Sequence, residues 1–253
     1  MKLSVSLQAV FGKRELSLEQ RLRKAAAQGY AAVEFWSWWD QDLKAIAHAA
    51  EETGVAIGSI CTKSVSLVDP AEREQYLVGL RESIAAAQQL NCKYLITLTG
   101  NTRDGVSREE QLASVVSGLR AAGQLLEGTG ITLILEPLNT LVDHPGYFLE
   151  RADEAAEIIR SVAHPQVRLL YDVYHQQITE GNLIPTIRKH MDIIDYFHIA
   201  DHPGRHEPGT GEINYDRVLE AIRASGYEGY IGLEYFTQED PEESLARIRK
   251  HYS

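Results

Sequence analysis

The sequence has little cysteine and no long hydrophobic run. Only two of its 253 residues are cysteines, Cys61 and Cys92, and both lie within apolar runs. Two thiols do not make a disulfide framework, so we expect free, buried cysteines and a reducing compartment. No stretch of 18 or more apolar residues occurs, so the sequence predicts no membrane-spanning helix.

We expect no signal peptide in the N-terminal stretch. The N-terminal stretch MKLSVSLQAVFGKR has one basic residue before a short, interrupted apolar run. This pattern is typical of a first β-strand and not of a secretory signal. We therefore expect a cytoplasmic protein.

Positive charge is in deficit. Lys and Arg total 25 against 36 Asp and Glu, which gives a formal net charge of −11. Proteins that bind nucleic acid need a positive surface opposite the phosphate backbone. The charge balance therefore argues against a nucleic-acid partner. With no membrane-spanning run expected either, we expect a small-molecule substrate and no membrane partner.

Short apolar runs alternate with longer amphipathic segments from end to end. The hydrophobic fraction of 44% and the charged fraction of 24% are those of a water-soluble globular protein. The runs expected to form strands are 3–7, 31–35, 55–60, 93–98, 131–136, 167–172, 193–200 and 230–234. Eight strands alternating with helices in a chain of this length predict an α/β fold, a (β/α)₈ TIM barrel.

The chain has no low-complexity segment, linker or change of composition, so we expect one domain over residues 1–253. A doubly wound open sheet is the alternative architecture. Its dinucleotide-binding form lacks support because no G-x-G-x-x-G follows the first expected strand.

Helix starts are recognisable: Ser17–Gln20 and Ser107–Glu110 fit the capping box, and Asp69 precedes Pro70 as an N-cap acceptor.

Four consecutive expected strands end in an acidic or imidazole side chain. These residues are Glu136, Asp172, His198 and Glu234. In a barrel, the carboxyl ends of the strands meet at one face, so the four side chains should lie close together. Three buried carboxylates would repel one another unless a positive charge lay between them. The pattern therefore predicts a metal site for one divalent ion, Mn²⁺ or Mg²⁺ by preference, with Co²⁺ or Zn²⁺ also suited.

Several runs carry a family resemblance. EPLN (136–139), YDVYHQQITEGNL (171–183), HIADHPGRHEPGTGEINY (198–215) and IGLEY (231–235) resemble hydroxypyruvate isomerases. SLQAVFG near the start and GYAAVEF at 29–35 extend the resemblance over nearly the whole chain. It implies membership of the xylose-isomerase-like barrel superfamily of sugar isomerases and epimerases. It also implies metal ligation by Glu136, Asp172, His198 and Glu234.

The implied activity is a carbohydrate-metabolism isomerisation, most simply of hydroxypyruvate to tartronate semialdehyde. A proton leaves one carbon and returns to its neighbour through a metal-stabilised enediolate, with Glu136 and Glu234 as the catalytic acid and base in unassigned order. The resemblance makes His175 a substrate-binding residue.

Three further residues are candidates for substrate binding. Arg205 has a planar guanidinium suited to a carboxylate, and Glu207 is a candidate partner for Arg205 or His198. Trp36, in the run FWSWWD at 35–40, could wall the pocket. Asn139 could contact the substrate or support Glu136.

Other activities stay open on this scaffold. A ketose 3-epimerase of the tagatose or allulose type would use the same metal and the same two glutamates. A histidine at position 198 resembles the ketose 3-epimerases, since some hydroxypyruvate isomerases carry Gln at this ligand position. An apurinic-site endonuclease shares the barrel but needs several zinc ions and additional histidines, and a barrel that only binds its ligand would not need every ligand position. Relatives are usually dimers or tetramers, so the resemblance implies a homo-oligomer.

Overall fold

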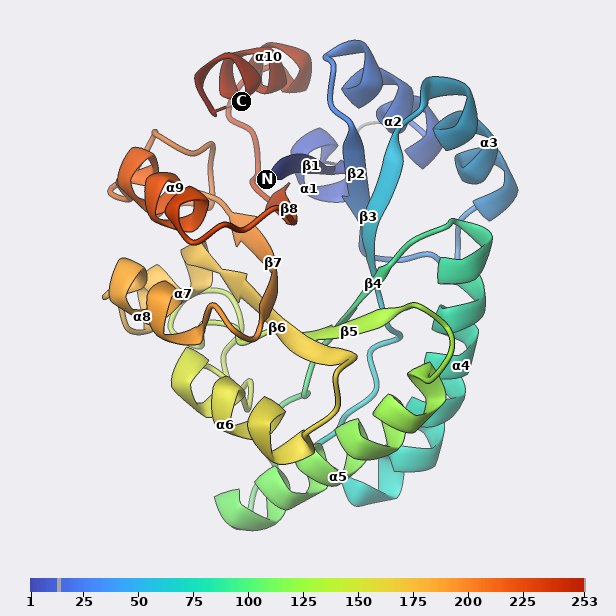
Figure 1. Ribbon diagram of the computed structural model, residues 1–253, viewed down its shortest axis with the longest axis vertical. Helices are drawn as coiled ribbons and strands as arrows, with labels where there is room; N and C mark the ends of the chain where they lie inside the picture. Colours follow the sequence, from blue (N-terminus) through green and yellow to red (C-terminus); the bar gives the residue numbers. More distant parts are fainter. Residues whose placement is uncertain (13–14, 253) are drawn as a thin grey trace.

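The fold is a closed barrel of parallel strands surrounded by helices (Figure 1). The computed structural model describes residues 1–12 and 15–252. The strands are β1 (Lys2–Ser6), β2 (Ala32–Phe35), β3 (Ala56–Cys61), β4 (Tyr94–Thr97), β5 (Thr132–Leu135), β6 (Val167–Asp172), β7 (Ile194–Ile199) and β8 (Tyr230–Leu233). They pair in sequence order, and β8 closes on β1. The predicted (β/α)₈ barrel is confirmed.

Helices follow the strands and cover the outside of the barrel (Figure 1). They are α1 (Leu7–Phe11), α2 (Leu18–Ala27), α3 (Leu43–Thr53), α4 (Arg73–Gln89), α5 (Arg108–Leu126), α6 (Ala152–Val162), α7 (Val173–Thr179), α8 (Leu183–His190), α9 (Tyr215–Ala224) and α10 (Pro241–Tyr252), with a 3₁₀ turn η1 at Pro70–Glu72. Both predicted capping boxes are present, at Ser17 and Ser107. Asp69 caps η1 through a bond from the backbone N–H of Ala71 at 2.9 Å. No helix in the described part of the chain is long and apolar enough to cross a membrane.

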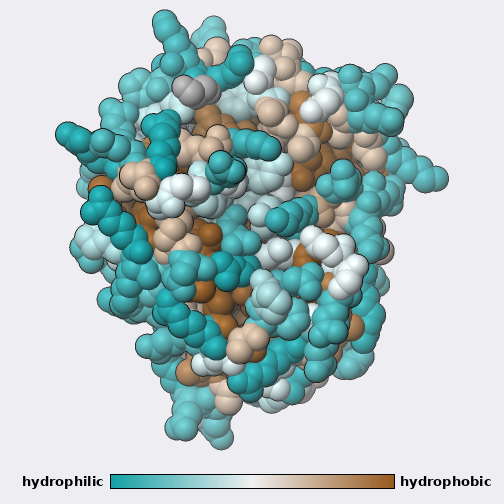
Figure 2. All heavy atoms as spheres, viewed as in Figure 1, coloured by the Kyte–Doolittle hydropathy of each residue, from teal (hydrophilic) through white to brown (hydrophobic). Residues whose placement is uncertain are grey.

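Side chains alternate between the two faces of each strand, which divides the core in two. On β5, Leu133 and Leu135 point outward into the large apolar layer beneath the helices, whereas Ile134 points into the barrel. The inner cluster of Ile134, Leu170 and Tyr196 fills the barrel below its carboxyl end. Hydrophilic residues cover most of the face shown in Figure 2, and hydrophobic ones show mainly in the hollows between them.

Candidate active site

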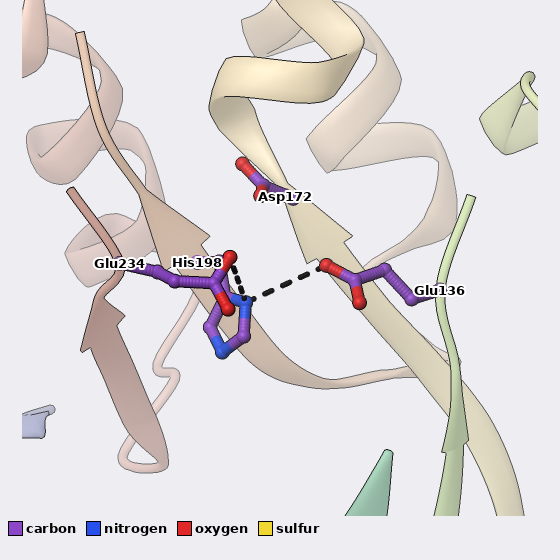
Figure 3. Close-up of side chains that lie close together, drawn as sticks. All are labelled: Glu136, Asp172, His198 and Glu234. Carbon is purple, nitrogen blue, oxygen red and sulfur yellow. Dashed lines mark ion pairs between the residues drawn. The ribbon is translucent and has the colours of Figure 1, made fainter. Parts of the chain in front are cut away.

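The four predicted strand-end side chains converge at one end of the barrel. The alternation explains why. Glu136, Asp172 and His198 each lie two residues beyond an inner-cluster residue of the same strand, so they point inward as well. Glu234 directly follows β8 and joins them. Figure 3 shows the three carboxylates and the imidazole facing one common space.

The group is compact and buried. Each of the four residues offers a ligand atom within 4.8 Å of the others. Nδ1 of His198 lies 3.5 Å from Oε1 of Glu136 and 3.4 Å from Oε2 of Glu234 (Figure 3). All four residues are at most 5% exposed. Charges at this depth interact strongly because water screens them little.

Burial and the neighbouring charges together set the pKa values of this group. It raises the pKa of Glu136, and it raises the pKa of Asp172 to about 7. Burial acts on Glu234 in the same direction, but the positive charges of His198 and Arg205 outweigh it and hold that pKa well below its usual range. Burial lowers the pKa of His198, yet the surrounding carboxylates, Glu234 first, raise it well above its usual value. The carboxylates therefore favour a positive charge at their centre.

The residues fit a divalent cation. Oε1 of Glu136 and Nδ1 of His198 are buried and have no hydrogen-bond partner, a costly state that a cation between them would relieve. Three carboxylates and one imidazole without a thiolate form the oxygen-rich donor set of Mn²⁺ or Mg²⁺ sites. Among the residues that the structure describes, no second group of potential ligands of this kind is found.

A cavity of about 370 Å³ adjoins the four-residue group. This volume lies within the range of small-molecule sites. Its lining includes Glu136 and Glu234 together with His175 and Arg205. A small ligand in this cavity would therefore contact two carboxylates of the four-residue group, an imidazole and a guanidinium together.

The loop after β7 brings Arg205 to this cavity. Gly204 and Arg205 have φ values of +97° and +58°, in a region that a residue with a side chain rarely adopts. The guanidinium contacts Glu234 and lies 3.8 Å from Oδ2 of Asp172. It also lies over the ring of Tyr174, 5.2 Å from the centroid. Strained backbone held by such contacts is typical of functional loops.

Known proteins match almost the whole chain. Residues 22–251 match the family model of xylose isomerase-like TIM barrels. The chain is 34% identical to the hydroxypyruvate isomerase of Escherichia coli (strain K12) over 264 residues, which cover 97% of each protein. The chain belongs to the hydroxypyruvate isomerase family of xylose isomerase-like TIM barrels.

Two further matches, one in sequence and one in structure, cover most of the chain. The 2-oxo-tetronate isomerase of Cupriavidus necator is 29% identical over 223 residues, which cover 85% of each protein. The crystal structure of AP endonuclease, family 2, from Brucella melitensis has a TM-score of 0.93 and 28% identity, and the match covers 100% of both chains. The named sequence relatives and the barrel together make this protein an isomerase.

In the isomerase, His175 and Asn139 occupy different positions relative to the cavity. His175, on α7, is fully buried and lines the cavity, with Nε2 3.5 Å from Oδ2 of Asp172. Asn139 is fully buried as well, but the cavity walls do not include it. Its amide nitrogen lies 2.7 Å from Nδ1 of His175. A substrate contact by Asn139 stays a prediction, whereas its contact with His175 is observed.

The tryptophans after β2 divide between the cavity and the core. Trp36 and Trp39 line the cavity. Trp36 also donates from Nε1 to Oε1 of Glu234 at 2.6 Å, so it fixes one of the candidate catalytic carboxylates. Trp38 donates instead to the backbone carbonyl of Cys61 at 3.0 Å.

Cys61 and Cys92 are both free, as predicted. Cys61 lines the cavity and is only half-buried, however, whereas both cysteines were predicted to be buried.

Two residues beside the site were not predicted from the sequence. Glu34 lies 2.9 Å from His198, and its signal was a single charge within the apolar run AAVEF. His144 lines the cavity, with its ring centroid 5.4 Å from that of His175. It lies in the loop after β5, where neither periodicity nor a strand end marks a residue.

The expected role of Glu207 is wrong. Its carboxylate accepts bonds from Thr237 Oγ1 at 2.6 Å, Ser244 Oγ at 3.0 Å and the backbone N–H of Gln238 at 3.1 Å. These partners follow β8, so Glu207 ties the loop that carries Arg205 to the next segment of the chain. It contacts neither of the partners predicted for it.

Proposed function

We propose that this isomerase interconverts hydroxypyruvate and tartronate semialdehyde, or a closely related 2-oxo sugar acid, with a bound divalent cation. One observation carries the proposal: three carboxylates and an imidazole from consecutive strands meet at the edge of a cavity. The names of the two relatives, a hydroxypyruvate isomerase and a 2-oxo-tetronate isomerase, support the substrate class.

Glu136 and Glu234 are the proposed acid and base. Their carboxylates approach Nδ1 of His198 from strands β5 and β8, and both line the cavity, so a substrate there has a proton acceptor and a proton donor. Positioned groups of this kind typically contribute about 10²–10⁴-fold to rate. When bound, the cation supplies Lewis-acid stabilisation of the negative charge that develops on the substrate oxygens.

His175 and Arg205 are the proposed substrate-binding residues. Nε2 of His175 is buried without a hydrogen-bond partner, so it is free to bond to a substrate oxygen. The guanidinium of Arg205 can hold a substrate carboxylate with two parallel bonds. Trp36 supplies an apolar wall and holds Glu234 in place.

A product assay tests this function. Metal-depleted protein is incubated with hydroxypyruvate, with 2-oxo-tetronate and with free ketoses, before and after addition of Mn²⁺ or Mg²⁺. We expect turnover of a 2-oxo acid that the cation restores and that Glu234→Gln abolishes. The matched control is Glu239→Gln, because Glu239 pairs with Arg247 on the surface.

The same assay separates the alternatives. Epimerisation of a ketose without turnover of either acid would make the protein a ketose 3-epimerase with the same site. Cleavage of DNA at an apurinic site, assayed in parallel, would favour the activity named for the Brucella structure. The net charge of −11 and the single imidazole in the ligand group argue against that activity. The homo-oligomer and the cytoplasmic location stay predictions.

A further inference from the structure

Glu34 is a buried carboxylate that the proposed reaction does not use. It lies on β2, is 3% exposed, and is not part of the four-residue ligand group. Its neighbour on β1 is Ser6, and the two residues are in register. A carboxylate inside a barrel is costly unless it is paired. Its partners therefore indicate what it does.

One oxygen of Glu34 faces the candidate metal ligand His198. Oε1 lies 2.9 Å from Nε2 of the imidazole. Nδ1, on the other side of the ring, faces Glu136 and Glu234 at 3.5 and 3.4 Å. The contact is an ion pair by distance, and neither Oε1 nor Nε2 has a hydrogen-bond partner. The imidazole of His198 thus lies between Glu34 on one side and Glu136 and Glu234 on the other, with one ring nitrogen directed at each side.

The other oxygen of Glu34 is held by Tyr196. The phenol oxygen donates to Oε2, so each carboxylate oxygen has a different partner. Tyr196 and His198 are two residues apart on β7 and share its inner face.

Two glycines make the space that this arrangement needs. Gly232 on β8 is in register with His198 on β7, and as a glycine it carries no Cβ. A Cβ there would lie 2.4 Å from Oε1 of Glu34 and 2.5 Å from Cδ2 of His198. At Gly58 on β3, a Cβ would lie 2.7 Å from the phenol oxygen of Tyr196. Neither glycine has the positive φ that would explain its presence by backbone conformation.

We propose that Glu34 is a positioning residue for the cation site. With a cation bound, its carboxylate would accept a hydrogen bond from Nε2–H of His198, which would leave Nδ1 unprotonated and available as the ligand atom. Tyr196 fixes the carboxylate, and Gly232 and Gly58 admit the pair into the barrel. The inference rests on the cation site of the proposed function. Carboxylates that orient a ligating histidine in this way commonly change metal affinity by about 10–100-fold.

Mn²⁺ titration calorimetry on metal-depleted protein tests the role of Glu34 without relying on turnover. We expect Glu34→Ala to weaken the Mn²⁺ affinity about 10–100-fold and Glu34→Gln to weaken it about 10-fold. Tyr196→Phe keeps the carboxylate and removes its donor, so a smaller loss in the same direction is expected. Asp195→Asn is the matched control on β7, because Asp195 pairs with Arg168 outside the site, and its affinity should equal that of the wild type.

A second readout is the tautomer of His198, that is, which of its two ring nitrogens carries the proton. In the Zn²⁺-loaded wild type, ¹⁵N NMR should show the ring proton on Nε2 and the metal on Nδ1. A proton on Nδ1, or wild-type Mn²⁺ affinity in both Glu34 variants, would overturn the proposal. If the Glu34 variants do not fold, wild-type affinity in folded Tyr196→Phe together with a proton on Nδ1 would overturn it. If the wild-type chain binds no Mn²⁺, the cation site of the proposed function is wrong and this inference falls with it.

Discussion

Asn139 donates two hydrogen bonds to a single nitrogen of His175. Its side-chain Nδ2 lies 2.7 Å from Nδ1, and its backbone N–H points to the same atom from 3.3 Å. The amide orientation is fixed because Oδ1 accepts from the backbone N–H groups of Val142 and Asp143 at 3.0 and 3.1 Å. Since both neighbours of Nδ1 are donors, Nδ1 must accept. The proton of the neutral imidazole is therefore on Nε2, at the cavity.

This relationship predicts a neutral His175 that donates to the substrate. Burial, and then the positive charge of Arg205, hold the pKa of His175 well below its usual value. We expect ¹⁵N NMR at neutral pH to show a neutral ring with the proton on Nε2. Asn139→Ala should lower kcat/KM by roughly 10- to 100-fold, because the ring loses its fixed orientation. A proton on Nδ1 in the wild type would contradict the assignment.

Arg205→Lys should raise KM for the acid substrate. Lysine keeps the charge but loses the planar pair of donors, and a hydrogen bond to a charged group is worth about 1.5–3 kcal/mol. Steady-state kinetics should therefore show KM increased at least about tenfold. Arg217→Lys serves as the control, since Arg217 pairs with Glu220 on the surface of α9. Unchanged KM in Arg205→Lys would mean that the guanidinium does not hold the carboxylate.

Glu207→Gln should destabilise the protein in a pH-dependent way. Burial alone raises the pKa of Glu207, but the bonds from Thr237, Ser244 and the backbone of Gln238 outweigh it and lower this pKa. A lowered folded-state pKa stabilises the fold above the unfolded-state value and loses that effect as the pH falls through the folded-state value.

At pH 7 the loss in Glu207→Gln should be about 1–3 kcal/mol, which is several degrees in Tm. Thermal unfolding from pH 7 down to pH 3 should show the difference between the two proteins shrinking. A constant difference over this range would contradict the role assigned to the carboxylate.

The barrel could be predicted because its strands are buried on both faces and appear as short apolar runs. Each predicted strand matches an observed one with ends that differ by one residue at most. The residues at the ends of β5 to β8 could be predicted for the same reason, since the alternation that buries Ile134 also turns Glu136 inward.

The partners of buried polar groups could not be predicted in this way. Glu34 meets His198 across the barrel, 164 positions later in the sequence, and only the closed sheet brings them together. Glu207 finds its partners about 30 to 37 positions later, after β8. Such contacts depend on the curvature of the barrel and on loop conformations, for which local sequence patterns give no measure.

The central claim is that Glu136, Asp172, His198 and Glu234 hold one catalytic cation. The most direct measurement titrates metal-depleted protein with Mn²⁺ while following calorimetric binding and 2-oxo acid turnover on the same sample. We predict one Mn²⁺ per chain, turnover that rises in proportion to occupancy, and loss of both in Asp172→Asn. Full turnover without bound metal, or Mn²⁺ binding that survives unchanged in Asp172→Asn, would contradict the account.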